Sequence, residues 1–301
     1  MVSMIDRYLL RYFLAVIDQG NFSKAAAYCN VSQPTLSAGI AKLETLLGRS
    51  LFNRTNRRVE LTEAAVQLTG HARRIEAEFA AAERDVQQAS TQATIRLGLL
   101  SSIPAGWIED YALALRDGGV SERVEFIEAR ERDLTERLAR GSLDAALTII
   151  RDDARFPAER LFSEGYSLAM AATHPLAGRA TIDGAELAGE PMIVRRHCEL
   201  LSDTSRYFTA RGVRPFFPAR VTSDDRALRL IRAGLGVTVM PDCFQAPGVV
   251  RPRLADFPFT RDVGLLFGAH ADTRLRGRTA LSLLAKIVES RSADGFARHP
   301  V

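Results

Sequence analysis

The spacing of apolar residues divides the chain into a helical N-terminal part and a mixed remainder. Apolar residues recur at helical spacing over residues 5–16, and Gly20 is positioned to end that helix. Ser23 is expected to cap a second, short helix over 23–30. Only Asn30 and Val31 separate this helix from the next helix start. A short helix, a tight turn and another helix predict a helix-turn-helix.

The helix after this turn has one apolar side and one polar side. Ser32 is expected to be its N-cap, and Pro34 is tolerated because N–H groups of the first turn have no intrahelical partner. Apolar residues from Leu36 to Leu47 follow at helical spacing and predict the buried side. The other side carries small polar groups, which allow a helix to lie deep in a major groove of DNA. The residues expected to contact DNA from these two helices are Ser23, Ser32, Gln33, Pro34, Thr35, Ser37 and Lys42.

The following segment, "RSLFNRTNRRVELT", predicts two short strands around Thr55 and Asn56. Arg54, Arg57 and Arg58 lie near the tip, as in a wing that contacts the DNA backbone or minor groove. Residues 1–62 hold eight Lys and Arg against four Asp and Glu, which equals the whole net charge of +4. This basic end favours a polyanion partner, although a solvated basic face gives the same count.

A third pattern begins after residue 62. Apolar residues alternate at +3 and +4 spacing over more than three heptads, namely Ala65, Leu68, Ala72, Ile75, Phe79, Ala82, Val86 and Ala89. This apolar stripe favours dimerisation through a long helix, because helix-turn-helix proteins use two half-sites. A helix packed on its own domain remains the alternative.

Beyond residue 93, predicted strands alternate with helices near 106–117, 131–140, 200–211 and 224–233. This order predicts parallel α/β sheets, which bind ligands at the carboxyl ends of their strands. The candidate effector-binding residues at those ends are Ser101, Ser102, Arg130, Arg195, Arg196, His197, Cys198, Thr222 and Ser223. Two arginines and a histidine in a row favour an anionic effector. Arginines that are solvated or paired with acids are the alternative.

The string "VSQPTLS" over 31–37, with Leu43-Glu44 and Leu51-Phe52-x-Arg54, closely resembles the winged helix-turn-helix of LysR-type transcriptional regulators. The match runs from about Leu9 to Ala65, and "ATHPLAG" (172–178) and "IRAGLGVTVMP" (231–241) resemble the effector domain of the same family. One departure is Ala38-Gly39, where many members carry a long polar or basic residue. We expect Gly39 to weaken the helix by about 1 kcal/mol relative to alanine.

The resemblance implies an α/β fold class with an N-terminal all-α winged helix-turn-helix, a long linker helix and a periplasmic-binding-protein-like, two-lobed effector domain. The implied ranges are 1–61 for the DNA-binding domain, 62–92 for the dimerising linker helix and 93–301 for the effector domain. Lobe one would span about 93–162 and 268–290, and lobe two about 163–267, with crossings near Ser163 and near Phe267–Gly268. It also implies a sequence-specific transcriptional regulator that binds an interrupted palindrome in double-stranded DNA as tetramers and is controlled by a small-molecule effector between the two lobes. A small-molecule binding protein without a regulatory role is the alternative.

Cys198 follows a histidine, as in the peroxide-sensing members of this family, which carry a reactive cysteine there and a resolving cysteine shortly after. The following segment, "ELLSDTSRYFTARG", has no cysteine, so disulfide switching of that kind is not expected. Sulfenate chemistry, an intermolecular bond, a plain pocket residue and simple packing all remain open.

Composition limits the remaining functions. The chain is 47% hydrophobic and 25% charged, and no apolar run approaches the roughly 20 residues that cross a bilayer. Three distant cysteines favour a reducing, cytoplasmic location beside the nucleoid. The five histidines show no metal spacing, and "GYSLA" over 165–169 lacks the last glycine of a nucleophile elbow. We therefore expect that the protein is not an enzyme, that it has no cofactor or metal, and that it does not bind a membrane. The expected partners are DNA, a small-molecule effector, further copies of the chain and RNA polymerase.

Overall fold

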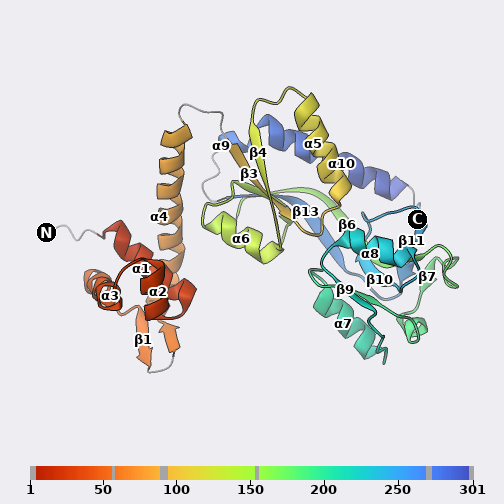
Figure 1. The fold of residues 1–301 in the computed structure, drawn as a ribbon, viewed down its shortest axis with the longest axis horizontal. Helices are drawn as coiled ribbons and strands as arrows, with labels where there is room; N and C mark the ends of the chain where they lie inside the picture. Colours follow the sequence, from red (N-terminus) through yellow and green to blue (C-terminus); the bar gives the residue numbers. More distant parts are fainter. Residues whose placement is uncertain (1–4, 56–57, 89–93, 153–155, 269–272, 298–301) are drawn as a thin grey trace. The chain divides into compact units, whose positions relative to one another are not determined.

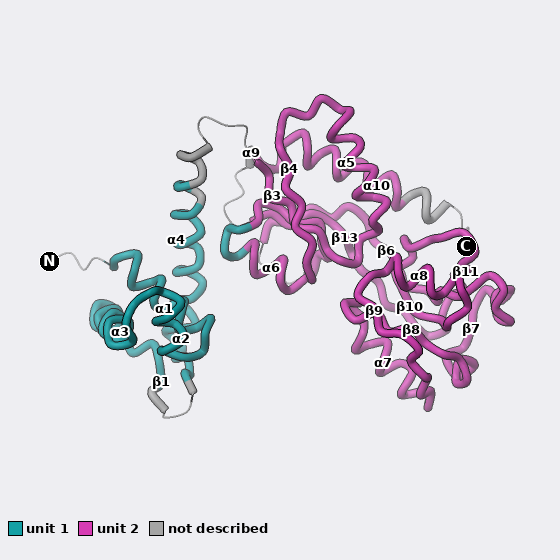
Figure 2. The backbone as a smooth tube through the Cα atoms, viewed as in Figure 1, with its two compact units in different colours: residues 1–91, 139–142 teal, residues 92–138, 143–301 magenta. Residues whose placement is uncertain are grey.

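The computed structural model describes residues 5–55, 58–88, 94–152, 156–268 and 273–297. The chain forms two compact units (Figures 1 and 2). The first comprises residues 1–91 with 139–142, and the second comprises residues 92–138 and 143–301. None of the described helices is both long and apolar enough to cross a membrane.

The first unit is built from helices with one two-stranded antiparallel sheet. Its elements are α1 (Arg7–Gln19), α2 (Phe22–Tyr28), α3 (Gln33–Leu47), β1 (Phe52–Thr55), β2 (Arg58–Leu61) and α4 (Glu63–Gln88). Strands β1 and β2 pair in register from Phe52–Leu61 to Thr55–Arg58, which forms the predicted wing.

Local capping signals account for most of these boundaries. Gly20 ends α1 in the left-handed conformation, at φ 62°, and Ser32 caps α3 by accepting the N–H of Thr35. The predicted cap of α2 was wrong. Asn21, and not Ser23, is the N-cap, since its Oδ1 accepts the N–H groups of Ser23 and Lys24 at 2.8 and 3.1 Å. The helix therefore begins one residue before Ser23.

Gly39 lies on the buried side of α3, where it contacts α1. A Cβ atom added there would lie 2.6 Å from Cδ2 and 3.0 Å from Cε2 of Tyr12. Tyr12 packs edge-on against Tyr8 and borders a core that includes Leu9 and Leu36. The glycine that was expected only to weaken the helix therefore allows α1 and α3 to approach closely.

The apolar stripe of α4 separates into two parts. Ala65 and Ala72 are buried in the core of the first unit, and Leu68 packs against that core. Further along the helix, Ile75 and Phe79 are 40% and 44% exposed. Ala82 is also exposed, whereas the side chain of Val86 and the whole of Ala89 lie outside the described part. The first half of the stripe thus packs on its own domain, and the second half leaves Ile75 and Phe79 partly exposed, with the guanidinium of Arg7 over the Phe79 ring at 4.4 Å.

The second unit is centred on a seven-stranded sheet, with the order β10-β6-β13-β5-β3-β4 and with β11 also paired to β6. The elements before residue 183 are β3 (Thr94–Leu100), α5 (Ala105–Asp117), β4 (Arg123–Ala129), α6 (Glu131–Ala139), β5 (Ala145–Ile149), β6 (Ala158–Ala171) and β7 (Thr181–Ile182). After it come η1 (Gly184–Leu187), β8 (Ile193–Arg195), α7 (Leu201–Ala210), β9 (Ala219–Val221), α8 (Asp224–Arg232), β10 (Thr238–Pro241), β11 (Val249–Val250), β12 (Arg253–Leu254), β13 (Thr260–Phe267), α9 (Thr273–Arg276) and α10 (Thr279–Ala297).

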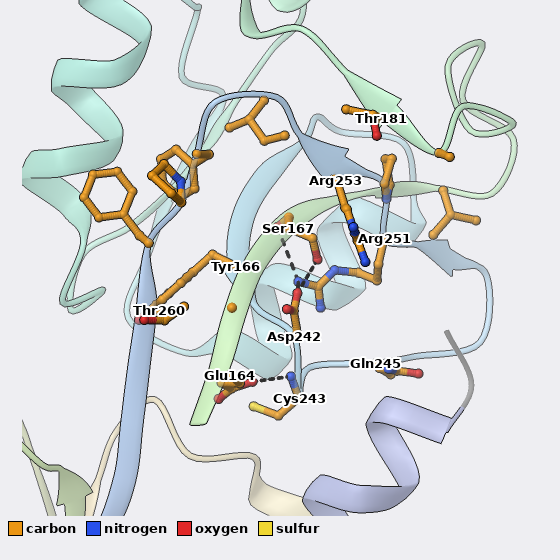
Figure 3. Close-up of a pocket in the computed structure, with 18 of the residues that line it drawn as sticks. Glu164, Tyr166, Ser167, Thr181, Asp242, Cys243, Gln245, Arg251, Arg253 and Thr260 are labelled. Atoms are coloured by element: carbon orange, nitrogen blue, oxygen red, sulfur yellow. Dashed lines mark hydrogen bonds and ion pairs between the residues drawn. The ribbon is translucent and has the colours of Figure 1, made fainter. Parts of the chain in front are cut away.

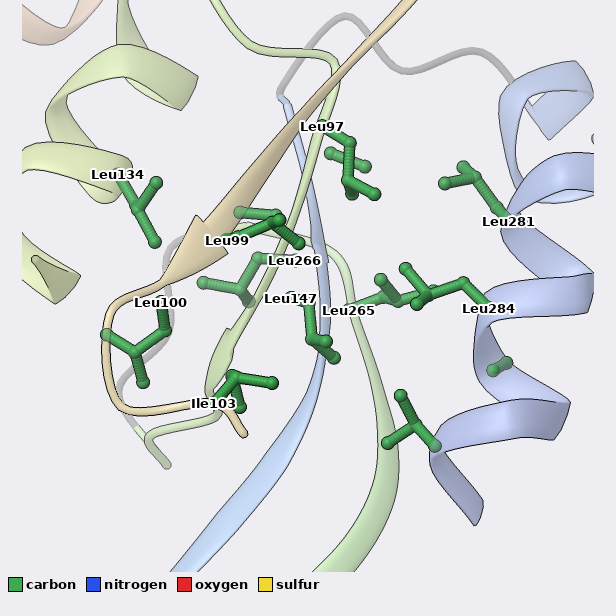
Figure 4. Packing of buried hydrophobic residues seen from close by; sticks show 14 of the residues in the cluster. Leu97, Leu99, Leu100, Ile103, Leu134, Leu147, Leu265, Leu266, Leu281 and Leu284 are labelled. Carbon is green, nitrogen blue, oxygen red and sulfur yellow. The ribbon is translucent and has the colours of Figure 1, made fainter. Parts of the chain in front are cut away.

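Strands β3, β4 and β5 are parallel, as predicted, but β6, β10 and β13 pair antiparallel. Leucines of β3, β5 and β13 pack towards Leu134 of α6 on one face and towards Leu281 and Leu284 of α10 on the other (Figure 4). Helices on both faces of the strands account for the continuous burial of β5, in which Thr148 is the one polar residue.

Two long strands carry the chain between the lobes. Strand β6 pairs with β13 up to Gly165 and with β10 from Tyr166, which places the first crossing close to the expected one near Ser163. The second crossing differs from the prediction. Residues Val263–Phe267 of β13 already pair with β5 in lobe one, so the chain crosses near the start of β13 and not near 267–268. The apolar run of β13 belongs to the core of lobe one.

Lobe two contains two further small parallel sheets, β8-β9 and β7-β12. An aromatic and aliphatic cluster around Tyr166, Tyr207 and Phe257 packs on one side of β6, and a second cluster around Ala169, Ile231 and Phe244 packs on the other. Lobe two therefore has its own core, and the ends of β8 and β9 are held beside each other.

The close approach at Gly39 makes a testable prediction. Gly39→Ala should lower the free energy of unfolding by about 1 kcal/mol, because overpacking costs about 1–3 kcal/mol and exceeds the gain in helix propensity. Gly70→Ala is the matched control, since nothing lies within 4 Å of its added Cβ in α4. This control should be up to about 1 kcal/mol more stable than wild type. Urea unfolding of both variants measures the difference, and a stabilised Gly39→Ala would contradict the packing argument.

Candidate functional site

The start of α3 presents the polar side chains that the sequence singled out. Ser32, Gln33 and Thr35 are exposed, as is Pro34, whereas Ser37 is half-buried. Ser32 and Thr35 join their hydroxyls at 2.7 Å, and Gln33 Nε2 donates to Ser37 Oγ at 2.9 Å. These contacts hold the side chains in place at a helix N-terminus, where backbone N–H groups favour a phosphate.

Lys42 lies on the same helix but is not a free cation. Its Nζ donates to Tyr8 Oη at 3.1 Å and to Asp6 Oδ2 at 3.3 Å. The hydrogen bond with Tyr8, followed by the one with Asp6, raises the pKa of Lys42. A contact between Lys42 and DNA would therefore have to replace these two exposed contacts.

The wing carries its arginines near the tip of the β1-β2 hairpin. Arg54 pairs in register with Val59, and Arg58 with Thr55. Arg57 lies outside the described residues, as do the side chains of Arg54 and Arg58. Their contacts with phosphate remain predictions, as does the role of the exposed Ser23.

In lobe one, the structure brings the predicted strand ends together. Ser101 follows β3 and donates both its N–H and its hydroxyl to Ala129 O, each at 3.0 Å, at the end of the parallel strand β4. Arg130 is the next residue and is exposed. Ser102 is 1% exposed, and its hydroxyl is already used within the protein, as described below.

The structure corrects the role expected of Arg195. Its side chain is 1% exposed and donates from Nε and Nη2 to the two carboxylate oxygens of Asp224, at 2.5 and 2.7 Å. Nη1 donates to Val239 O at 3.2 Å and to Cys198 Sγ at 3.4 Å. All of these partners belong to lobe two, so Arg195 is a structural cation and not a binding group for an effector.

The two residues that follow Arg195 are less buried than Arg195 is. Arg196 is exposed, and its N–H donates to Val221 O at 2.8 Å. Burial lowers the pKa of His197, and its Nε2 is buried with no hydrogen-bond partner. Because β8 and β9 are parallel, Thr222 and Ser223 lie at the same edge. Thr222 is exposed, whereas Ser223 Oγ accepts the N–H of Arg226 and caps α8. The structure thus leaves Arg196 and Thr222 accessible.

Cys198 lines a cavity of about 400 Å³ between α7 and the strands of lobe two. The wall of the cavity is mainly apolar and includes Leu201, Phe208, Val213, Pro215, Phe217 and Val239. Burial raises the pKa of the Cys198 thiol, Arg195 opposes this effect, and the charge of Glu199 adds to it. The thiol is therefore protonated at neutral pH in this conformation.

Sequence reasoning missed three residues that meet beside Cys198. Glu199 Oε1 accepts from Arg261 Nη1 at 2.6 Å and from Tyr166 Oη at 2.7 Å. Its Oε2 accepts from Ser102 Oγ at 3.3 Å. Arg261 also donates to Glu164 Oε1 at 2.8 Å. Charges at 164 and 261, next to the apolar runs of β6 and β13, were the available signal, since buried charges are almost always paired.

A larger cavity, of about 740 Å³, lies beside the point where β6 leaves lobe one (Figure 3). None of the predicted effector residues lines it. Arg251 lines this cavity. Its guanidinium donates to five backbone oxygens, those of Ser167, Leu168, Met240, Pro241 and Phe244. Burial lowers the pKa of Arg251 to about 10. Asp242 accepts from Ser167 Oγ at 2.6 Å and lies 3.8 Å from Arg251. This arginine holds three chain segments together.

Among the described residues, no group of three His, Cys, Asp or Glu side chains could hold a metal ion.

Two family models match the chain. Residues 8–66 match the bacterial regulatory helix-turn-helix protein, lysR family, and residues 88–286 match the LysR substrate binding domain. The chain is 32% identical over 298 residues to a probable hydrogen peroxide-inducible genes activator of Mycobacterium avium, and the match covers 94% of each of the two chains. It is 29% identical over 296 residues to the DNA-binding transcriptional dual regulator OxyR of Escherichia coli (strain K12), which covers 95% of this chain and 96% of the relative.

Solved structures agree with these matches. A full-length OxyR variant from Pseudomonas aeruginosa has a TM-score of 0.55 at 26% identity and covers 95% of both chains. Full-length BenM has a TM-score of 0.52 at 22% identity and covers 96% of this chain and 98% of its own, a likeness that concerns the fold alone. The predicted fold class, a winged helix-turn-helix followed by a two-lobed α/β domain, is confirmed.

The contrast between Arg195 and Arg196 can be measured. Arg195→Gln should destabilise the second unit by about 3–5 kcal/mol, because it leaves the carboxylate of Asp224 buried without its cation. Arg196→Gln, one residue away and exposed, should stay within about 0.5 kcal/mol of wild type. Chemical unfolding followed by circular dichroism compares the two variants. Similar effects would mean that Arg195 is not the structural cation of lobe two.

Proposed function

The chain belongs to the LysR family of bacterial transcriptional regulators, and on that premise we propose that its regulatory signal is oxidation of Cys198 by a peroxide. The observation that carries this proposal is the position of the thiol. Cys198 Sγ lines a cavity and receives an N–H from Arg195 at 3.4 Å. The relative from Mycobacterium avium is named for the response of its target genes to hydrogen peroxide, which supports the same signal here.

The proposed reaction is a two-electron oxidation. Cys198 first loses its proton; the thiolate sulfur then attacks one oxygen of hydrogen peroxide, the O–O bond breaks, and the departing hydroxide takes up that one proton and leaves as water. Cysteine is oxidised to sulfenic acid and the peroxide is reduced. Helix α7 contains no cysteine, so a disulfide with that helix cannot follow. The sulfenic acid itself, placed between Arg195 and α7, would change the packing of lobe two.

DNA binding follows from the family and from the first unit. Two copies joined through α4 would place two α3 helices in successive major grooves. The exposed Ile75 and Phe79 on α4 support such pairing, because pairing would cover both apolar side chains. We extend the proposal to tetramers on an interrupted palindrome, where the regulator would meet RNA polymerase at the promoter.

The first experiment treats the full chain with hydrogen peroxide and traps sulfenic acid with dimedone. Mass spectrometry should locate the adduct at Cys198, and the DNA footprint should change. Cys198→Ser should abolish both effects, whereas Cys29→Ser and Cys243→Ser should retain them. If the footprint of the wild type did not respond to peroxide, the signal would have to be sought elsewhere.

A second candidate signal is a small anion bound between the lobes. The exposed Arg130 and Arg196, which follow strands of different lobes, favour this candidate. Arg195 does not contribute, since it is paired with Asp224. A footprint that responds to small carboxylates and is abolished in Arg130→Gln and Arg196→Gln would support this candidate over the first.

Glu199 should limit the reactivity of Cys198, since its charge raises the pKa of that thiol. In Glu199→Gln this negative charge is absent, so the pKa should fall and the thiolate fraction at neutral pH should rise, by about two- to tenfold. The rate of alkylation of Cys198 by iodoacetamide, followed against pH by peptide mass spectrometry, should show its midpoint at lower pH. Glu190→Gln, which removes a carboxylate elsewhere in lobe two, should leave that midpoint in place. An unchanged midpoint in Glu199→Gln would contradict the charge effect.

The two parts of the DNA-binding surface should respond differently to truncation. Gln33→Ala should loosen sequence preference, because Gln33 lies at the N-terminal end of α3, which reads base edges. Arg54→Ala should weaken binding to all duplexes alike and flatten the salt dependence, as expected of a phosphate contact. Binding isotherms on specific and random duplexes at several salt concentrations test both. Equal losses of specificity in the two variants would contradict this division.

A further inference from the structure

The cavity beside Cys198 lies inside lobe two and not between the lobes. All of the described residues that line it fall within residues 192–239. They come from β8, from α7, from the segment that leads from α7 to β9, and from β10. Neither Arg130 nor Arg196, which favour a small anion as the second candidate signal, is among them. This cavity is therefore separate from the place where such an anion would bind.

The deep part of the cavity is apolar. Phe208 of α7, Val213 and Val239 of β10 line it, and each of them is at most 5% exposed. Thr238 also lines it, but its hydroxyl donates to Ile193 O at 2.7 Å and is therefore not free for a ligand. A wall of this kind favours an alkyl or aryl group through the hydrophobic effect.

Apolar side chains also border the outer part of the cavity. Leu201 and Phe217 line it and are 37% and 38% exposed. The exposed hydroxyl residues Ser205 and Thr209 lie beside them on the lining. The apolar lining thus extends from the interior to the solvent, which gives an apolar molecule a route of entry.

The volume of about 400 Å³ is more than hydrogen peroxide needs. A cavity of roughly 150 Å³ lined by aliphatic and aromatic groups holds a benzene molecule. The cavity beside Cys198 is more than twice as large. Hydrogen peroxide is polar at both ends, so it would leave most of the apolar wall without a contact. The cavity instead fits a molecule with one reactive polar end and an apolar body.

The reactive sulfur and a cation border the same space. Arg195 lines the cavity together with Cys198, and its Nη1 donates to Cys198 Sγ at 3.4 Å. A guanidinium beside the sulfur stabilises the oxyanion that departs when an O–O bond breaks. The thiol, the guanidinium and the apolar wall are thus within reach of one bound molecule.

Resting on the oxidation of Cys198 proposed above, we propose that the substrates of this thiol are organic hydroperoxides, ROOH, whose alkyl or aryl group R is held in the cavity. Cys198 first loses its proton, and the thiolate sulfur attacks the oxygen of ROOH that carries the hydrogen. The O–O bond breaks, and the cysteine is oxidised to sulfenic acid. The departing alkoxide takes up the proton that Cys198 lost and leaves as the alcohol ROH. Each CH₂ group of R that becomes buried should strengthen binding by about fourfold.

The relative rates of two peroxides test this inference in the full chain. Oxidation of Cys198 by cumene hydroperoxide and by hydrogen peroxide is followed by trapping with dimedone at timed intervals and by peptide mass spectrometry. Each rate constant is divided by that of glutathione, which has no cavity. On this scale cumene hydroperoxide should react at least about tenfold faster than hydrogen peroxide. Equal values for the two peroxides would overturn the inference.

Thr204→Phe separates the cavity from the chemistry. Thr204 lies on α7 and lines the cavity, so a phenyl group there occupies the space that R needs. The variant should react with cumene hydroperoxide about tenfold more slowly than wild type and keep its rate with hydrogen peroxide. Ser202→Phe is the matched control, since Ser202 is exposed on the same helix and does not line the cavity, and it should keep both rates. Equal slowing of both reactions by Thr204→Phe would overturn the inference.

If Thr204→Phe does not fold, wild type alone decides the question. Linear alkyl hydroperoxides of increasing chain length should oxidise Cys198 at low concentration with rates that rise by up to about fourfold per CH₂ group until the cavity is full. Rates that do not depend on chain length would overturn the inference.

These experiments distinguish the inference from the proposed signal. If hydrogen peroxide oxidises Cys198 and no organic hydroperoxide does so faster on the glutathione scale, the inference is overturned and the proposed signal stands. If neither class of peroxide gives sulfenic acid at Cys198, both are overturned.

Discussion

Glu164 of β6 and Arg261 of β13 are both buried where the chain passes between the lobes, and the second unit depends on pairing them. The two residues stand opposite each other in the strand register, and their side chains are 1% and 2% exposed. A buried charge without its partner is strongly destabilising. Neither strand can therefore shift its register without separating this pair.

The same arginine links the pair to the candidate regulatory region. Arg261 also contacts Ser102 at the end of β3 and Glu199 beside Cys198, so three chain segments meet at one guanidinium. Arg195 has the corresponding role inside lobe two, where it joins β8, α8 and β10. Two arginines thus bring a cysteine, a glutamate and the ends of several strands into one region. Oxidation of the cysteine would disturb the packing of lobe two, one residue away from the contact between Glu199 and Ser102 of lobe one.

The first unit depends on packing and not on buried charge. Its core joins α1, α2, α3 and the start of α4 through aliphatic and aromatic side chains. Gly39 lets α3 lie close to Tyr12, while the opposite side of the helix keeps small polar groups exposed. The helix is therefore firmly held by one face and free to contact DNA with the other.

The sequence by itself determined the features that depend on a few neighbouring residues. Gly20, Ser32 and Pro34 marked helix ends, apolar spacing marked the stripe of α3, and the string around Val31–Ser37 indicated the family. The cap of α2 was misplaced by local competition, since Asn21 and Ser23 are both good caps.

Tertiary structure decided which charged residues are partners and which are available to ligands. Arg195 and Arg196 are equivalent in a sequence motif, but only Arg195 lies opposite Asp224, which is 29 residues away. Arg261 finds partners 62 and 97 residues away, in Glu199 and Glu164. No local pattern specifies such pairs. They arise because folding brings distant segments together in a low-dielectric interior, where an unpaired charge is too costly to remain.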